Sequence, residues 1–345
     1  MSNPTAVSME SLLQSLPGQI ESALVLGREF AAKNKFRNIR KVLFYGMGGS
    51  AIGGDILKSI MSDRSRVLFS VSRQDRWSRR IDHETLVIFS SYSGNTAEIL
   101  DVFNQAVRSR ARLLGVSSGG LLCDLAAKHR VPFLKIPGGM PPRCALGFLA
   151  FALLPALEKL GEFRIPDKEI QEVLKTVRHV PHAKVRRLAK QLAGRLIHIY
   201  SSSGFMQPAA VRWRAEIAEN AKMLASHHLL PEMFHNEIEG WMHPRWAIQK
   251  SAAVFLTDRD DAAELTVKIA AASHYIRKQG GTALNVASQG NSLLARLFSL
   301  ILFGDWLSYE LALLNKVDPV TIHAISAIKQ AGERNAKSMR QRKKR

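Results

Sequence analysis

Short apolar segments alternate with helix-like segments through the first half of the chain, and this alternation restricts the fold more than any other feature. Apolar segments without an in/out pattern are typical of parallel strands that helices cover on both faces. The sequence therefore predicts an α/β fold with a doubly wound parallel sheet, a flavodoxin-like αβα sandwich. The predicted strands are 42–45, 67–71, 86–90, 112–116 and 131–135, and the helices between them are 51–62, 97–109 and 121–129.

The same alternation returns after residue 194, and a chain of 345 residues is long enough for two domains, so a duplicated half is expected. Strands are predicted at 196–200, 252–256 and 283–286. Helices are predicted at 8–33, with an interruption near Pro17-Gly18, and at 144–160, 208–225, 262–278, 293–315 and 321–334. The predicted organisation is an N-terminal helical segment at 1–35, a first domain at 36–165, a helical connector at 166–193, a second domain with a C-terminal helix at 194–330, and a disordered basic tail at 331–345.

The composition argues against several classes of protein. Cys123 and Cys144 form no disulfide framework and match no metal-ligand spacing, so a reducing cytoplasm is expected. The N-terminal segment lacks the basic cluster of a secretory signal, and the apolar run 145–157 is too short to cross a membrane. The net charge of +20 includes a tail from Arg334 without any acid. We expect a solvated terminus there, with a polyanion-binding arm as the alternative.

A glycine-rich bend, Gly46 to Asp55, joins the first predicted strand to a helix. Backbone N–H groups in this context can hold an anion at the helix N-terminus. No Lys-Ser/Thr pair follows, which excludes a Walker A loop, and Ala51 breaks the dinucleotide-binding fingerprint. A tight turn with close helix packing is the alternative.

A second loop, 90–96, places hydroxyls around Gly94 at the end of a neighbouring predicted strand. Capping the helix from Ala97 would require only Ser93 or Thr96, but Ser91 is also present. Hydroxyls and free N–H groups are donors to phosphate oxygens. Since both loops end strands of one parallel sheet, we predict that they share a phosphate site.

Several charged residues have more than one interpretation. Glu216 and Glu219 share a stripe of helix 208–225, which is a solvated face if Lys222 or Arg212 balances Glu219. If the two carboxylates are close, the pKa of one is raised, which suits proton transfer. By themselves, Arg143 and Lys329 are ordinary surface cations. Four histidines follow this helix, but their spacing matches no metal-ligand pattern: His227, His228, His235 and His243. By itself, His235 is interpreted as a structural, hydrogen-bonded residue.

Five segments resemble one family in the same order along the chain. They are Gly46-Met47-Gly48-Gly49-Ser50, Ser91-Tyr92-Ser93-Gly94-Asn95-Thr96, Pro142-Arg143, Glu219-Asn220-Ala221-Lys222 and His235-Asn236-Glu237-Ile238-Glu239-Gly240-Trp241. The resemblance is to the bifunctional phosphoglucose/phosphomannose isomerases, which are built from two sugar isomerase (SIS) domains. It covers residues 36–330 and leaves the basic tail outside.

The resemblance implies an aldose–ketose isomerase of glycolysis and gluconeogenesis that needs no metal or organic cofactor. It would interconvert glucose 6-phosphate, and mannose 6-phosphate, with fructose 6-phosphate through a cis-enediolate. By motif, Glu219 is the base, Arg143 stabilises the enediolate, and His235 opens the sugar ring with help from Lys329. That histidine comes from the second subunit of a homodimer, and Thr321 is the candidate for accepting both epimers. The phosphate-binding residues are Gly49, Ser50, Ser91, Ser93 and Thr96.

The partners implied are sugar phosphates and a second copy of the chain, with neither a membrane nor a nucleic acid. Two other functions stay open. One is a non-catalytic SIS protein that binds a sugar phosphate to regulate a partner, with the tail engaging nucleic acid. The other is a different SIS enzyme, such as an amino-sugar isomerase or an etherase. A base and a ring-opening acid argue against mere binding, because binding requires neither.

Overall fold

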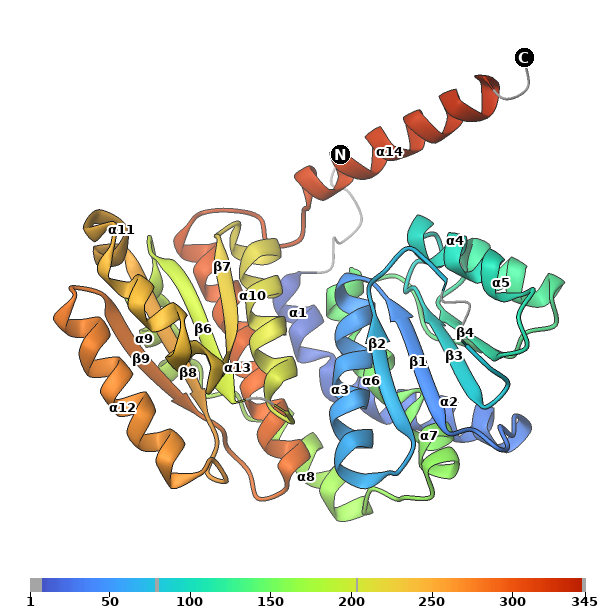
Figure 1. The fold of residues 1–345 in the computed structure, drawn as a ribbon, viewed down its shortest axis with the longest axis horizontal. Helices are drawn as coiled ribbons and strands as arrows, with labels where there is room; N and C mark the ends of the chain where they lie inside the picture. The colour runs from blue at the N-terminus through green and yellow to red at the C-terminus, as the bar shows by residue number, and fades with distance from the viewer. Residues whose placement is uncertain (1–7, 78–80, 203, 343–345) are drawn as a thin grey trace.

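Two parallel sheets form the framework of the molecule, and Figure 1 shows them beside each other. The computed structural model describes the backbone of residues 8–77, 81–202 and 204–342, and the side chains of these residues up to 332. Every strand pair within each sheet is parallel. The predicted α/β fold with two doubly wound sheets is confirmed.

The first sheet has the strand order β2-β1-β3-β4-β5, which is the order of flavodoxin-like folds. All five predicted strands are present, with ends shifted by one or two residues. Their bounds are β1 Lys41–Gly46, β2 Leu68–Ser72, β3 Thr85–Ser90, β4 Arg112–Ser117 and β5 Phe133–Lys135.

Helices cover both faces of this sheet because alternate residues of each strand point in opposite directions. Phe44 and Ile88 belong to a core that includes α3 and α6. Their neighbours Tyr45 and Phe89 pack against α4 and α5 instead. The helices of this part are α1 Met9–Gln14, α2 Leu16–Lys33, α3 Gly48–Arg64, α4 Ala97–Ala106, α5 Gly120–Lys128, α6 Leu146–Phe151 and α7 Leu154–Gly161.

Two predicted helices are divided in the structure; the break near Pro17-Gly18 is as predicted, and the break in helix 144–160 is not. The predicted helix 8–33 is α1 and α2, and Pro17 lies in the first turn of α2. The predicted helix 144–160 is a 3-10 turn, η1 Pro142–Cys144, followed by α6 and α7. Pro155 lies in the first turn of α7, where its missing N–H costs no hydrogen bond, and the helix therefore restarts there.

The second sheet has the order β7-β6-β8-β9, the same as the first without a fifth strand. Strand β7 was not predicted, because its sequence Ala-Ser-His-His-Leu-Leu was read partly as the end of helix 208–225. That helix, α10, ends at Ala221, where Lys222 adopts a left-handed conformation with φ of 58°. The strands are β6 Leu196–Ser202, β7 Ala225–Leu230, β8 Ser251–Thr257 and β9 Thr282–Ala287.

The long apolar helix α13 is the core of the second half. By length and composition it could cross a membrane, with a mean hydropathy of 1.5, contrary to the expectation that no segment is long enough. However, 67% of that stretch is buried inside the protein. It packs against α8, α9 and α10, so it is read as a core helix. The remaining helices are α8 Asp167–Arg178, α9 His182–Leu192, α10 Gln207–Ala221, α11 Arg245–Gln249, α12 Ala263–Lys278 and α13 Leu293–Leu314, with 3-10 turns η2 Glu232–His235 and η3 Glu237–Met242.

The last helix, α14, covers His323–Arg342 and projects away from the two α/β units (Figure 1). The sequence predicted its end at Arg334 and a disordered tail from residue 331. The backbone is instead helical as far as Arg342, and residues 343–345 of the predicted tail lie outside the described residues. The proposed domain boundaries remain predictions.

Candidate active site

The two predicted phosphate loops lie next to each other at the carboxyl ends of β1 and β3. Gly46 at the end of β1 pairs in register with Ser90 at the end of β3. The Ser50 hydroxyl accepts a hydrogen bond of 3.1 Å from the Tyr92 backbone N–H, which ties the two loops together. The prediction that both loops meet at one edge of the sheet is therefore confirmed.

The glycine bend also lets the segment carrying Arg143 approach. A Cβ on Gly49 would lie 2.9 Å from the carbonyl carbon and oxygen of Pro142, closer than real Cβ atoms come. Gly48, with φ of +49°, supplies the left-handed turn that precedes α3. The close-packing interpretation of this bend is therefore confirmed, and its binding of phosphate stays a prediction.

The serine loop does not use its hydroxyls to cap α4, which corrects that alternative. Thr96 is the N-cap residue, but its side chain makes no capping hydrogen bond. Its hydroxyl lies 2.7 Å from that of Ser91, and the exposed Ser93 hydroxyl accepts from the Asn95 N–H at 3.3 Å. Since no described side chain caps them, the first amides of α4 can donate to an anion.

Arg143 is buried, with 2% of its surface exposed, so its interpretation as a surface cation is wrong. Its Nε donates to Asn220 at 2.7 Å, and its Nη2 donates to the backbone carbonyls of Pro319 at 2.7 Å and Val320 at 2.9 Å. Its Nη1 lies 3.4 Å from Oε2 of Glu219. These contacts fix the guanidinium next to the candidate base.

Glu219 lies in the last turn of α10 with 24% of its side chain exposed. Lys222 does not balance its carboxylate. Instead the Lys222 ammonium donates to the backbone carbonyls of Glu219 at 2.6 Å and Thr321 at 2.7 Å. The solvated-face interpretation is therefore wrong, and the carboxylate of Glu219 faces Arg143.

A buried polar network supports this pair from below. Asn220 donates to Glu216 at 3.0 Å and to Ser308 at 2.9 Å, while its oxygen accepts from Arg143. Arg212 binds both carboxylate oxygens of Asp305 at 2.7 and 2.9 Å and donates to the backbone carbonyl of Arg143 at 2.9 Å. Sequence analysis missed Asn220 and Asp305, although a carboxylate in the apolar segment of α13 was a usable signal.

Burial raises the pKa of Glu216 to about 7. The ion pair with Arg212, at 3.0 Å, opposes this shift, while the carboxylates of Asp305 and Glu219 add to it. The prediction that one carboxyl of the stripe has a raised pKa is confirmed for Glu216. A neutral Glu216 can accept from Asn220 without placing a further negative charge beneath Glu219.

The Glu216 pKa predicts how stability depends on pH. Its folded pKa of about 7 exceeds the unfolded value of 4.5, so the folded state holds more protons between these values. Its contribution is complete below about pH 4.5 and is lost as pH rises toward 7, by on the order of 3 kcal/mol. We expect the free energy of unfolding of the wild type to fall relative to Glu216→Gln across this range and to level off above it. A pH-independent difference in denaturant melts would contradict the raised pKa.

His235 and Lys329 lie outside this cluster. His235 is exposed on η2, after the edge strand β7, and Lys329 is exposed on the projecting helix α14. Neither makes a described contact with Arg143 or Glu219. Tyr200 donates to Glu237 at 2.6 Å and Trp241 donates to Tyr200 at 3.1 Å, so the segment following His235 is held against the second sheet. Among the described residues, no group of three or more His, Cys, Asp or Glu side chains could hold a metal ion.

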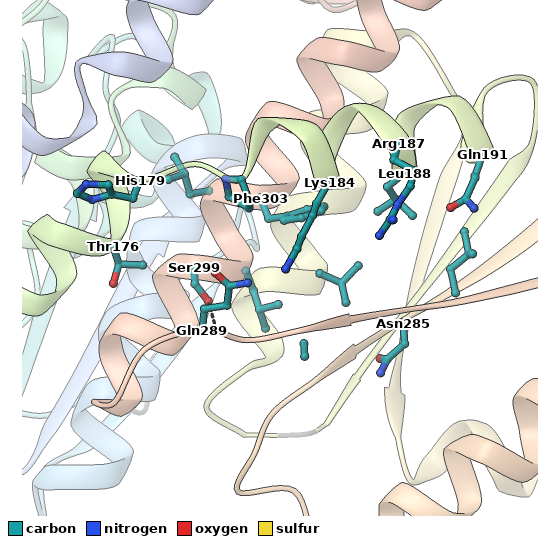
Figure 2. Close-up of a pocket in the computed structure, with 16 residues that line it drawn as sticks. Thr176, His179, Lys184, Arg187, Leu188, Gln191, Asn285, Gln289, Ser299 and Phe303 are labelled. Atoms are coloured by element: carbon teal, nitrogen blue, oxygen red, sulfur yellow. Dashed lines mark hydrogen bonds between the residues drawn. The ribbon is translucent and has the colours of Figure 1, made fainter.

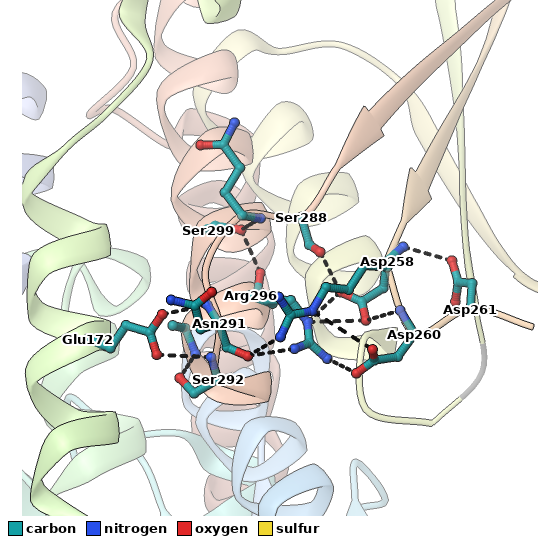
Figure 3. A network of polar contacts seen from close by, with 12 residues as sticks. Glu172, Asp258, Asp260, Asp261, Ser288, Asn291, Ser292, Arg296 and Ser299 are labelled. Carbon is teal, nitrogen blue, oxygen red and sulfur yellow. Dashed lines mark hydrogen bonds and ion pairs between the residues drawn. The ribbon is translucent and has the colours of Figure 1, made fainter.

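A salt-bridge network lies at the carboxyl end of β8 in the second sheet, as Figure 3 shows. Asp258 follows β8, and Arg296 from α13 donates to it at 2.9 Å and also pairs with Asp260. Glu172 of α8 accepts from the backbone N–H of Ser292 at 2.9 Å. Arg296 is therefore already paired with two carboxylates at this strand end.

Comparison with known proteins gives a consistent set of similarities. Residues 182–331 match the family described as the bacterial phospho-glucose isomerase C-terminal SIS domain. The chain is 30% identical to a D-glucosamine-6-phosphate 4-epimerase of Sulfolobus acidocaldarius, over 59% of this chain and 64% of that protein. The structure of a hypothetical protein from Thermus thermophilus has a TM-score of 0.78 at 16% identity, covering 97% of this chain and 92% of that one, which shows a shared fold.

A more extensive similarity includes both halves of the chain. A bifunctional phosphoglucose/phosphomannose isomerase of Caldicellulosiruptor bescii is 34% identical over 325 residues, which are 91% of this chain and 96% of that enzyme. The chain belongs to the bifunctional phosphoglucose/phosphomannose isomerase family.

Proposed function

We propose that this protein is an aldose–ketose isomerase that interconverts glucose 6-phosphate and mannose 6-phosphate with fructose 6-phosphate. The observation that carries the proposal is the Arg143–Glu219 pair, which η1 and α10 hold beside the phosphate loops. A buried guanidinium and a partly exposed carboxylate at a phosphate site fit a reaction in which a proton moves and an oxyanion forms.

In this reaction Glu219 removes the proton from C2 of the open-chain aldose and returns it to C1. The hydroxyl proton on O2 passes to O1 in the same interconversion, so the product is the ketose and no atoms are gained or lost. Arg143 faces the negative charge that develops on the cis-enediolate oxygens. Its other N–H groups are held by Asn220 and two carbonyls, so it needs little reorganisation as that charge forms.

The phosphate is held at the opposite side of the substrate by the two loops. Ser50, Ser91, Ser93 and Thr96 supply hydroxyls, and Gly49 supplies a backbone N–H group at the start of α3. The backbone carbonyl of Thr321, in the segment before α14, accepts a hydrogen bond from Lys222 at the end of α10. We propose that Thr321 allows the site to accept both C2 epimers of the sugar.

A substrate series tests this proposal directly. Protein treated with EDTA should interconvert fructose 6-phosphate with both glucose 6-phosphate and mannose 6-phosphate. Glucosamine 6-phosphate is the discriminating control, because a 30% identical relative is an epimerase of that sugar. Turnover of the amino sugar alone would identify a different SIS enzyme. Melting that shifts with ligand but without turnover would identify a binding protein.

We further propose a homodimer in which each active site takes His235 from the other subunit. Two observations support it: His235 is exposed away from Glu219, and Lys329 projects from the body on α14. Neither group reaches the Arg143–Glu219 pair within one chain. A cytoplasmic location is proposed on the free thiols of Cys123 and Cys144, which suit a reducing compartment.

Subunit complementation tests the shared site. Glu219→Gln and His235→Ala should each impair the homodimer, but a mixed dimer has one site with both native residues. Equal mixing after dissociation is expected to restore about a quarter of wild-type activity, because half of the dimers are mixed and each has one intact site. If both residues came from the same chain, mixing would restore nothing. Size-exclusion chromatography with light scattering provides the oligomeric state of each sample.

A further inference from the structure

A cavity of about 520 Å³ lies in the second half of the molecule, between α9, β9 and α13. Its volume is within the range of small-molecule sites, about 300–1,000 Å³. It belongs to the second sheet, whereas the phosphate loops belong to the first. Leu300 and Phe303 on α13 form part of its wall. The Phe303 ring stacks on Trp213 of α10, whose indole N–H donates to the backbone carbonyl of Leu300.

The duplicated architecture explains why this space exists. In the first sheet, β5 pairs with β4 through residues 115–117. In the second sheet β9 takes the place of β4, and no fifth strand pairs with it among the described residues. The cavity runs along residues 284–287 of β9, at the edge that a fifth strand would occupy.

The charged side chains that line the cavity are positive. Lys184 and Arg187 are three residues apart on α9, hence on the same face, and Figure 2 shows both pointing toward β9. Neither has a described ion pair, and none of the described lining residues carries a carboxylate. Arg186, between them in sequence, instead pairs with Glu310 at 3.9 Å. Two like charges on adjacent positions of one helix face repel each other, and an anion between them removes that repulsion.

The rest of the lining suits a flat, partly apolar group. Amide side chains, which can bind the edge of a base, come from Gln191 and Gln289. The apolar lining side chains are Leu188, Leu284, Val286, Leu300, Leu302 and Phe303. We propose that the cavity binds a nucleoside monophosphate, with its phosphate between Lys184 and Arg187 and its base against the apolar wall. Arg187 can bind two phosphate oxygens at once, and Lys184 adds a point charge.

Isothermal titration with AMP, GMP, CMP and UMP tests the proposal, each with and without saturating fructose 6-phosphate. At least one nucleotide should bind with a Kd below about 1 mM, the weak end of specific affinities. The sugar phosphate should leave that Kd unchanged. Lys184→Gln with Arg187→Gln should weaken binding at least about tenfold, as expected for loss of charge-assisted hydrogen bonds. The matched control Arg186→Gln should bind like the wild type.

Several results would overturn the proposal. Absence of binding by all four nucleotides would do so, as would competition with fructose 6-phosphate or unchanged binding by the double variant. Inorganic phosphate binding as tightly as the best nucleotide would show that the apolar wall holds no base. Because turnover is not a readout, these outcomes are independent of the proposed isomerase activity.

Discussion

Glu219→Gln is expected to lower kcat for glucose 6-phosphate by about 10²–10⁴-fold, the usual contribution of a positioned acid–base group. Glutamine has the same shape and its oxygen can still accept from Arg143, which lies 3.4 Å away. It has no carboxylate to take the C2 proton. We therefore expect KM to change little and exchange of the C2 hydrogen with solvent deuterium to disappear from NMR spectra.

The matched control for this change is Glu169→Gln. Glu169, like Glu219, is a glutamate paired with an arginine, Arg64 at 2.8 Å, but it lies on α8 outside the site. The Glu169→Gln variant should change the free energy of unfolding without changing exchange of the substrate C2 hydrogen with solvent. If the Glu219→Gln variant exchanged the C2 hydrogen as fast as the wild type, Glu219 would not be the base. Another group would then have to take the C2 proton.

Arg143→Lys is expected to lower kcat by about 10²–10³-fold, as removal of one oxyanion-stabilising donor does in other enzymes. Lysine keeps the positive charge in this buried position but loses the planar group that binds Asn220, two backbone carbonyls and Glu219 together. The charge beside the enediolate is then no longer fixed in place. Steady-state kinetics in both directions measure this loss.

Arg64→Lys is the control for Arg143→Lys. Arg64 is a mostly buried arginine whose guanidinium pairs with carboxylates away from the site. Thermal melting of both variants separates a loss of folding from a loss of rate. A kcat for Arg143→Lys close to that of the wild type would refute the electrostatic role.

The strands and most helices could be predicted because local sequence controls them. An uninterrupted apolar segment such as Leu86 to Phe89 can be stable only between two helical layers, and it is fully buried here. Strand β7 could not be predicted in the same way. It is an edge strand whose residues alternate between exposed and partly buried positions, so its histidines carry little apolar signal.

The candidate site could be predicted in part. Motif order identified Arg143 and Glu219, but composition and spacing alone favoured a surface cation and a solvated helix face. Their environment depends on segments distant in sequence: Asn220 of α10 and the carbonyls of 319–320 surround the Arg143 guanidinium. The burial of a residue and the electrostatic potential around it depend on all of its neighbours in space. Sequence periodicity indicates only the neighbours on the same helix.

By itself, the sequence determined the two parallel sheets, the glycine-rich and serine-rich loops at the strand ends and the residues available for acid–base chemistry. These depend on local backbone preference and on the pattern of apolar residues. Only the tertiary structure decided that Glu219 faces Arg143, that burial raises the pKa of Glu216 to about 7, and that Arg296 pairs with carboxylates where β8 ends. The physical reason is that electrostatic interactions depend on distance and on exclusion of water, which are set when separate helices pack together.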